Sequence, residues 1–211
     1  MSHSKERHGM KRTQKMIVLG VAFGLYAVSI LVAEWLPPLF MGPFELSMEY
    51  ALFLPLILCI FFHPLYAATG AALAELLIGS MILGHFEGFM MIGRVIALFA
   101  ALWIGGMMVK NPRDKIQIAV AALAVVLIFQ SANMMMSLVQ LAAAAETLGA
   151  VPGLSQLLIL MEGFVFFKTI LVSGLLYTVL PTTLLVPYFS RNSESIELEN
   201  TMDIGMLKPV R

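Results

Sequence analysis

The chain has 211 residues, of which 60% are hydrophobic and only 12% are charged, and its formal net charge is zero. An ordinary soluble domain carries about 25% charged residues, so the composition excludes that class and indicates a single bundle of membrane-spanning helices. The lone cysteine, Cys59, excludes an intrachain disulfide and a metal site built from several cysteines.

The chain begins with a basic arm at 1–15, followed by an apolar run at 16–36 that ends at Pro37-Pro38. This run is longer than the apolar core of a signal peptide, and no A-x-A-like cleavage site follows it. We therefore predict a retained first span at 16–36. The link at 37–48 is polar enough to be an outer loop.

Residues 50–83 form an apolar run too long for one ordinary span, which needs about 20 residues. The run is either one overlong helix or two short ones. His63-Pro64 lies near its middle, and proline disfavours helix in the residue before it. A single span would place the basic 110–115 turn outside, against the preference of Lys and Arg for the cytoplasmic side. This parity argument decides for spans at 48–62 and 65–83, of which the first is short and either tilted or partly re-entrant.

The second half of the chain predicts three more spans and their links. The predicted spans are 89–109, 116–138 (with a possible extension into the alanines 142–145) and 157–180, which Pro181 ends. The predicted links are an outer turn at 84–88, an inner turn at 110–115 and an outer loop at 146–156. The stretch 181–189 is expected along the inner interface, so the membrane domain covers 16–189, and 190–211 is a polar tail.

The distribution of Lys and Arg sets the orientation. Cytoplasmic loops carry the excess of these residues, and the links at 37–48, 84–88 and 140–156 contain none. Eleven of the thirteen lie in the two ends and the inner turn: Lys5, Arg7, Lys11, Arg12, Lys15, Lys110, Arg113, Lys115, Arg191, Lys208 and Arg211. The sequence therefore predicts an all-α bundle of six transmembrane helices with both termini cytoplasmic, in the cell inner (plasma) membrane.

The two remaining cations, Arg94 and Lys168, lie inside predicted spans with Glu75 and Glu162. At ~1.5 Å per residue, all four lie between the outer ends of their helices and the midplane. The inner half carries no charge, whereas a conduction path would continue polar groups to the inner face. The pattern favours a ligand cup open to the outside. The alternative is that Glu75–Lys168 and Glu162–Arg94 are ion pairs that only fix helix packing.

Other polar residues complete the predicted cup. Asn133, a predicted site residue, and Gln130 lie in the outer half of the same span. Trp35, at the end of the first span, is expected to cover the mouth. No P-loop, Gly-x-Ser-x-Gly elbow or His-Glu-x-x-His helix occurs. We therefore expect neither an enzyme nor a bound cofactor or metal.

Small residues spaced four apart let helices approach closely. The pairs Ala67/Ala71 and Gly70/Ala74, and the pair Ala101/Gly105, are expected to serve internal packing. Gly20 and Gly24, in the first span, are candidates for docking another membrane protein.

The pattern from Leu54-Pro55 through His63-Pro64 to Ala74-Glu75 resembles the S component, the substrate-binding membrane subunit of energy-coupling factor (ECF) vitamin transporters. Members of that family often have an early proline, a Gly-Pro turn, spaced small residues and an acidic residue here; in this chain His63 replaces the glycine. Gly20 and Gly24 stand where the family commonly has Ala-x-x-x-Ala. The resemblance implies ligand binding from outside and uptake driven by a transmembrane coupling subunit and ATPase subunits on separate chains.

The sequence thus predicts a substrate-capture subunit for a vitamin or similar small molecule. Two alternatives remain open. One is a self-sufficient carrier in which Glu75 or Glu162 takes a proton. The other is a non-transporting membrane assembly or sensor protein.

Overall fold

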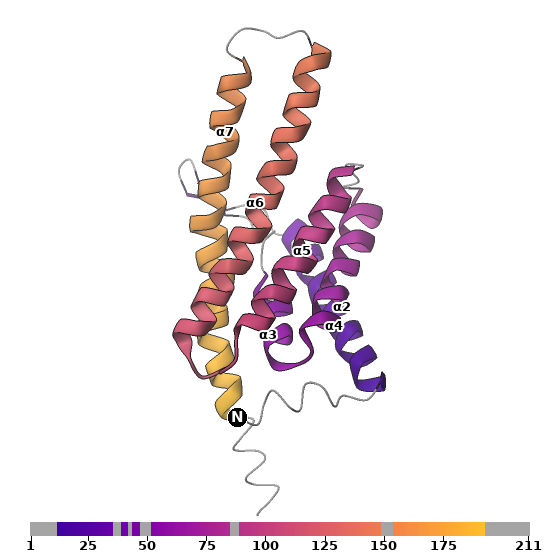
Figure 1. Cartoon of the computed structure of the whole chain (residues 1–211), viewed down its shortest axis with the longest axis vertical. Helices are drawn as coiled ribbons and strands as arrows, with labels where there is room; N and C mark the ends of the chain where they lie inside the picture. Colours follow the sequence, from indigo (N-terminus) through magenta and orange to yellow (C-terminus); the bar gives the residue numbers. More distant parts are fainter. Residues whose placement is uncertain are drawn as a thin grey trace, which may run out of the picture.

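The computed structural model of the chain describes residues 12–35, 39–41, 44–46, 52–84, 89–148 and 154–192. Nearly all of them lie in helices that form an elongated bundle (Figure 1). Most of the predicted basic arm at 1–15 and of the tail at 190–211 falls outside the described residues.

The first half of the described chain contains α2 (Arg12–Trp35), β1 (Leu39–Met41), β2 (Phe44–Leu46), α3 (Phe53–Phe61), α4 (Pro64–Ala74) and the π-helix η2 (Glu75–Ile82). The second half contains α5 (Phe89–Met108), α6 (Lys115–Leu148), α7 (Leu154–Lys168) and the π-helix η3 (Thr169–Val179), after which α-helix continues over 180–192. The strands form an antiparallel hairpin in which Leu39 pairs with Leu46, so the predicted loop at 37–48 holds the one departure from all-α structure in the described part.

Among the described residues, five helices are long and apolar enough to cross a membrane: Arg12–Trp35, Pro64–Ile82, Met90–Met108, Lys115–Gln140 and Ile159–Asn192. These helices are compatible with an integral membrane protein. The predicted span at 48–62 is the exception, because α3 has nine residues. At 1.5 Å per residue it is roughly 13 Å long, less than half of the hydrocarbon core.

Proline explains one predicted boundary and contradicts another. His63 is extended (φ −93°, ψ 110°) and Pro64 opens α4, which confirms the predicted break. Pro181, in contrast, does not end a helix, so the predicted boundary at 180 is wrong and 181–189 is not a separate interfacial segment. The wider π-type turns of η3 immediately before it change the local hydrogen-bond register, which lets a helix accommodate a residue without an N–H.

The predicted extension of the 116–138 span is confirmed, because α6 runs unbroken to Leu148. The predicted outer loop at 146–156 is correspondingly shorter, since α7 begins at Leu154. In Figure 1, α6 and α7 project beyond the ends of the other helices.

Close glycine contacts show how the helices run. Gly105 of α5 lies against Val125 of α6, and Gly93 lies against Met136, so these two helices are antiparallel. Helix α4 runs in the same direction as α2. The Lys15 Nζ lies 5.5 Å from the Tyr66 ring centroid, and a Cβ at Gly70 would lie 3.0 Å from that of Ala22.

Helix α3 folds back along α4. A Cβ at Gly106 of α5 would lie 2.7 Å from the Cys59 Cβ and 2.9 Å from the Pro64 Cβ, so the α3–α4 turn meets the end of α5. A Cβ at Gly105 would lie 3.3 Å from the side chain of Leu56, which precedes Cys59 by about one turn. Helix α3 therefore runs parallel to α5 and antiparallel to α4, and consecutive described helices alternate in direction.

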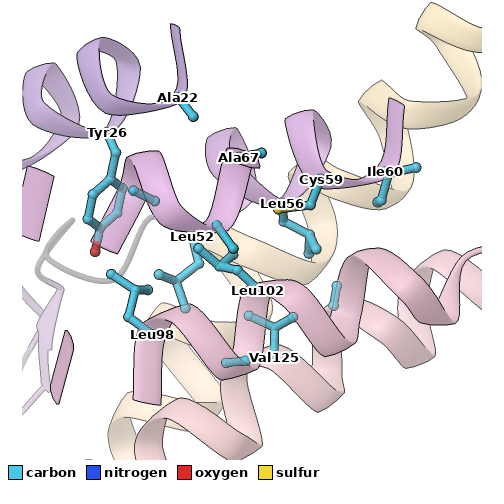
Figure 2. Packing of buried hydrophobic residues seen from close by; sticks show 14 of the residues in the cluster. Ala22, Tyr26, Leu52, Leu56, Cys59, Ile60, Ala67, Leu98, Leu102 and Val125 are labelled. Atoms are coloured by element: carbon cyan, nitrogen blue, oxygen red, sulfur yellow. The ribbon is translucent and has the colours of Figure 1, made fainter. Parts of the chain in front are cut away.

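The hydrophobic core lies where α2, α3, α4, α5 and α6 meet (Figure 2). Small residues allow this close packing: Ala67, Ala71, Ala74 and Ala101 are fully buried. A side chain on Gly70 would collide with the Leu19 carbonyl of α2. The internal packing role predicted for the small-residue pairs of these spans is thus confirmed.

Candidate ligand-binding site

An ion pair joins η2 to α5. The Nε of Arg94 lies 2.9 Å from Oε1 of Glu75, and the two side chains are 25% and 6% exposed. The Nε–H does not align for a hydrogen bond, so this contact is electrostatic. The structure therefore brings together two of the predicted site residues, in a different pairing from the packing alternative, which joined Glu75 to Lys168 and Arg94 to Glu162.

The backbone around Glu75 leaves room beside its carboxylate. The π-helix η2 begins at Glu75, and π-type turns often occur at functional sites. A Cβ at Gly79 would lie 3.6 Å from the Glu75 Cδ, so the carboxylate folds along its own helix toward a residue without a side chain. Ser80, also buried, donates its hydroxyl to the Leu76 carbonyl of the same helix.

The ion pair lies beyond the amino end of α3. Because Leu56 lies against Gly105, Leu52 is level with about residue 101 of α5. Arg94 lies seven residues (101 − 94) closer to the amino end of α5, a distance of roughly 10 Å. Helix α3 thus covers α4 and α5 in the apolar half of the bundle, and the charged pair begins past its end.

Tyr26 belongs to the same layer and was missed in the sequence analysis. Helices α2 and α4 are parallel and Ala22 lies opposite Gly70, so Tyr26 is level with Ala74 and Glu75. Its side chain is 2% exposed, and Figure 2 shows the ring pointing from α2 into the bundle. A single tyrosine within a 24-residue apolar helix does not by itself indicate a functional site. Its position four residues after Ala22 places it on the helix face that packs against α4.

Helices α6 and η3 place further polar groups near this depth. Gly93 lies against Met136, so Arg94 is level with about residue 135 of α6, half a turn from the half-buried Asn133. Gly174 of η3 lies against Val126, which places Lys168 roughly one helical turn deeper than Arg94. Lys168 is half-buried at the end of α7, and within the described part of the chain it makes no ion pair.

Gln130 and Thr169 are also buried polar residues at the contact between α6 and η3. The sequence analysis placed Gln130 beside Asn133 but did not predict it as a site residue, and it did not name Thr169. Thr169 directly follows Lys168, and Gln130 lies one turn from Val126 on the face that meets Gly174. Their burial at the level of Lys168 extends the polar layer from α5 across α6 to η3.

The described part of the chain joins none of the remaining predicted residues to the ion pair. Trp35, at the end of α2, is 87% exposed and covers no described part of the site. Glu162 lies in α7, and its side chain is outside the described residues. Around Gly20 and Gly24 the space is open: a Cβ at either position would meet nothing within 4 Å.

We define the polar layer as Tyr26, Glu75, Arg94, Gln130, Asn133, Lys168 and Thr169. Its donors and acceptors can hold a small polar molecule, and the guanidinium and ammonium groups favour an anionic or carbonyl group. An ionisable side chain at membrane depth is costly, which makes Glu75 and Arg94 candidates for function.

A family model described as "Family of unknown function (DUF8171)" matches residues 16–196. That range covers every described helix except the first turn of α2. No curated protein and no solved structure matches the chain.

Proposed function

Because the chain belongs to DUF8171, a family of unknown function, we propose a function from its own residues: capture of a small molecule from outside the cell by a polytopic protein of the inner (plasma) membrane. The observation that carries the proposal is the Glu75–Arg94 ion pair, placed between apolar helices beyond the amino end of α3. In this proposal the protein binds and delivers its ligand and is not an enzyme.

The pair supports ligand binding because its two members differ in exposure. The Glu75 carboxylate is 6% exposed and fixed by its surroundings, whereas the Arg94 side chain retains 25% exposure. Complete burial of an ion pair is costly unless well-aligned hydrogen bonds satisfy both groups, and the Arg94 Nε–H is not aligned with Glu75. A ligand oxygen can approach the partly exposed Arg94 side chain, and Lys168 and Asn133 add donors near the same depth.

The proposed topology has six passes, with α3 as a short pass that does not cross the membrane alone. Both chain ends then lie on the cytoplasmic side with the basic residues. The polar layer lies in the outer half, so ligand enters from outside. Trp35 would cover the mouth only after moving from its exposed position.

A ligand screen tests this function. Purified protein is heated with a library of small polar and anionic compounds, and compounds that raise the unfolding temperature are titrated. Arg94→Met and Lys168→Met should each weaken the affinity by ~1–3 kcal/mol, as expected for charge-assisted hydrogen bonds. Arg113→Met, in the exposed 110–115 turn, is the control and should bind normally. Unchanged affinity in both site variants would favour the packing role.

Energy coupling by separate chains is the second part of the proposal and follows the resemblance to ECF S components. Its support is the open face of α2 at Gly20 and Gly24, which offers close approach to a coupling subunit. Gly20→Leu with Gly24→Leu should abolish uptake in cells and leave ligand binding intact. Normal uptake by the double variant would remove this part of the proposal.

A proton-coupled carrier is the alternative that the burial of Glu75 favours. A carboxylate at this depth can bind either a proton or a cationic ligand, so that one displaces the other. Proteoliposomes that contain only this chain distinguish the two. Uptake without partner subunits, lost in Glu75→Gln, would support the carrier; no uptake would support the capture subunit.

A further inference from the structure

A group of six cations, five exposed and one (Lys15) half-buried, surrounds the end of the bundle opposite the polar layer. We call this group the basic rim; it comprises Arg12, Lys15, Lys110, Arg113, Lys115 and Arg191. Lys15 lies over Tyr66 at the start of α4, and Gly106, near the end of α5, lies against Pro64. Val109, Ile118 and Val186 share one buried cluster, which brings the 180–192 helix to the same end.

Cations outnumber carboxylates among the described residues at this end of the bundle. The single described acidic side chain at this end is Asp114, and it caps α6. Its Oδ1 accepts from the N–H of Ile116 at 3.0 Å and from that of Gln117 at 3.3 Å. A carboxylate held at a helix amino end compensates the partial positive charge there, so the six cations retain a net positive surface.

The part of the rim between α5 and α6 is held rigid by its own side chains. The Gln117 Oε1 accepts from the backbone N–H of Lys110 and of Asn111, both at 3.0 Å. The Asn111 Oδ1 accepts from the N–H of Arg113, also at 3.0 Å. The turn therefore has a fixed backbone. Binding of a ligand to its exposed cations costs the protein little backbone entropy.

The rim also lies where the apolar surface of the bundle ends. Ile116, directly after Lys115, is 77% exposed, and Met107 and Met108 are exposed just before Lys110. Cations that follow an apolar surface by one or two residues lie at the depth of lipid phosphates, and long Lys and Arg side chains reach that level.

We propose that the basic rim binds the headgroups of anionic phospholipids, with the rigid Lys110–Lys115 turn as its main contact. The rim matches a negatively charged lipid surface in charge, in depth and in its arrangement around one end of the bundle. This inference does not depend on the function proposed for the polar layer.

The test compares lipids that bind to the full-length protein in native mass spectrometry. Detergent-purified protein is titrated with phosphatidylglycerol or phosphatidylcholine. Lys110→Gln with Lys115→Gln should weaken phosphatidylglycerol binding roughly tenfold and leave phosphatidylcholine binding unchanged. Lys208→Gln with Arg211→Gln removes the same charge from the tail and should have little effect. Unfolding temperatures in phosphatidylcholine confirm that both variants are folded.

Two results would overturn the proposal. One is equal binding of the two lipids by the unmodified protein. The other is an equal loss in the turn and tail variants, which would mean that net charge, not the rim, sets lipid binding. A third variant, Gln117→Ala, keeps every cation and loosens the turn; a several-fold loss of phosphatidylglycerol binding is expected if the rigid backbone contributes.

Discussion

Glu75 is the one charged side chain that is fully buried in the described part of the chain, and Arg94 neutralises it. Taking a carboxylate out of water costs several kcal/mol, and a nearby cation offsets part of that cost. Gly79 leaves space beside the carboxylate, and Tyr26 of α2 is buried at about the same level. In the proposed function, stability and ligand binding depend on the same residues.

The pair predicts an asymmetric response to substitution. Arg94→Met alone leaves the Glu75 carboxylate without this cation and should lower the free energy of unfolding by about 3 kcal/mol. Glu75→Gln combined with Arg94→Met removes both charges and should be closer to the unmodified protein. Equilibrium unfolding in mild detergent measures both variants. A double variant less stable than the single one would show that the pair contributes more attraction than it costs in desolvation.

Sequence predicted the residues of the pair but not their pairing. Charges inside apolar runs are conspicuous, so Glu75, Arg94 and Lys168 were identified from the sequence alone. The choice of Arg94 over Lys168 as the partner of Glu75 depends on which helices are neighbours, and one sequence does not contain that information. Tyr26 and Thr169 were missed because their burial follows from helix contacts and not from residue type.

Individual helices are shaped by where glycine and proline lie. Gly70 lets α4 pack against the Leu19 carbonyl of α2, and Gly106 lets α5 pack against the α3–α4 turn. The break before Pro64 was predicted because proline disfavours helix in the residue before it, and the structure confirms it. The continuation of the helix through Pro181 was not predicted, because the two long π-helical segments have no recognised sequence pattern.

Two matched glycine variants test the packing of α2. Gly70→Ala puts a methyl group against backbone and should lower the free energy of unfolding by about 1–3 kcal/mol, the usual cost of overpacking. Gly24→Ala meets open space and should be neutral or stabilise by up to ~1 kcal/mol through helix propensity. Thermal unfolding of both variants gives the comparison, and equal effects would contradict the close α2–α4 contact.

The whole molecule has a polar layer toward one end and a basic rim at the other, separated by the apolar core around α3. The apolar composition predicted the helical membrane class, and charge parity predicted that the chain would reverse between 48 and 83. The structure has that reversal, but the predicted second span, at 48–62, is a nine-residue helix. The sequence predicted a short span here but not where its helix begins; residues 48–52 include Glu49 and are less apolar than the residues that form α3.

Orientation in the membrane is tested by cysteine labelling of intact cells. In a Cys59→Ala background, Trp35→Cys should react with a membrane-impermeant maleimide from outside, because the residue is exposed at the outer end of α2. Asn111→Cys, in the exposed 110–115 turn, should react only after the cells are opened. Labelling of position 111 in intact cells would contradict cytoplasmic termini.

Capture of a small molecule in the polar layer is the central claim, and mass spectrometry of molecules that copurify with the protein tests it most directly. Small molecules are extracted from the purified unmodified protein and from the Glu75→Gln/Arg94→Met double variant, which is expected to be folded. The account predicts a compound that is present with the unmodified protein and depleted at least tenfold in the double variant, a loss of ~1.4 kcal/mol or more in binding. The same compounds in the same amounts in both preparations would contradict it.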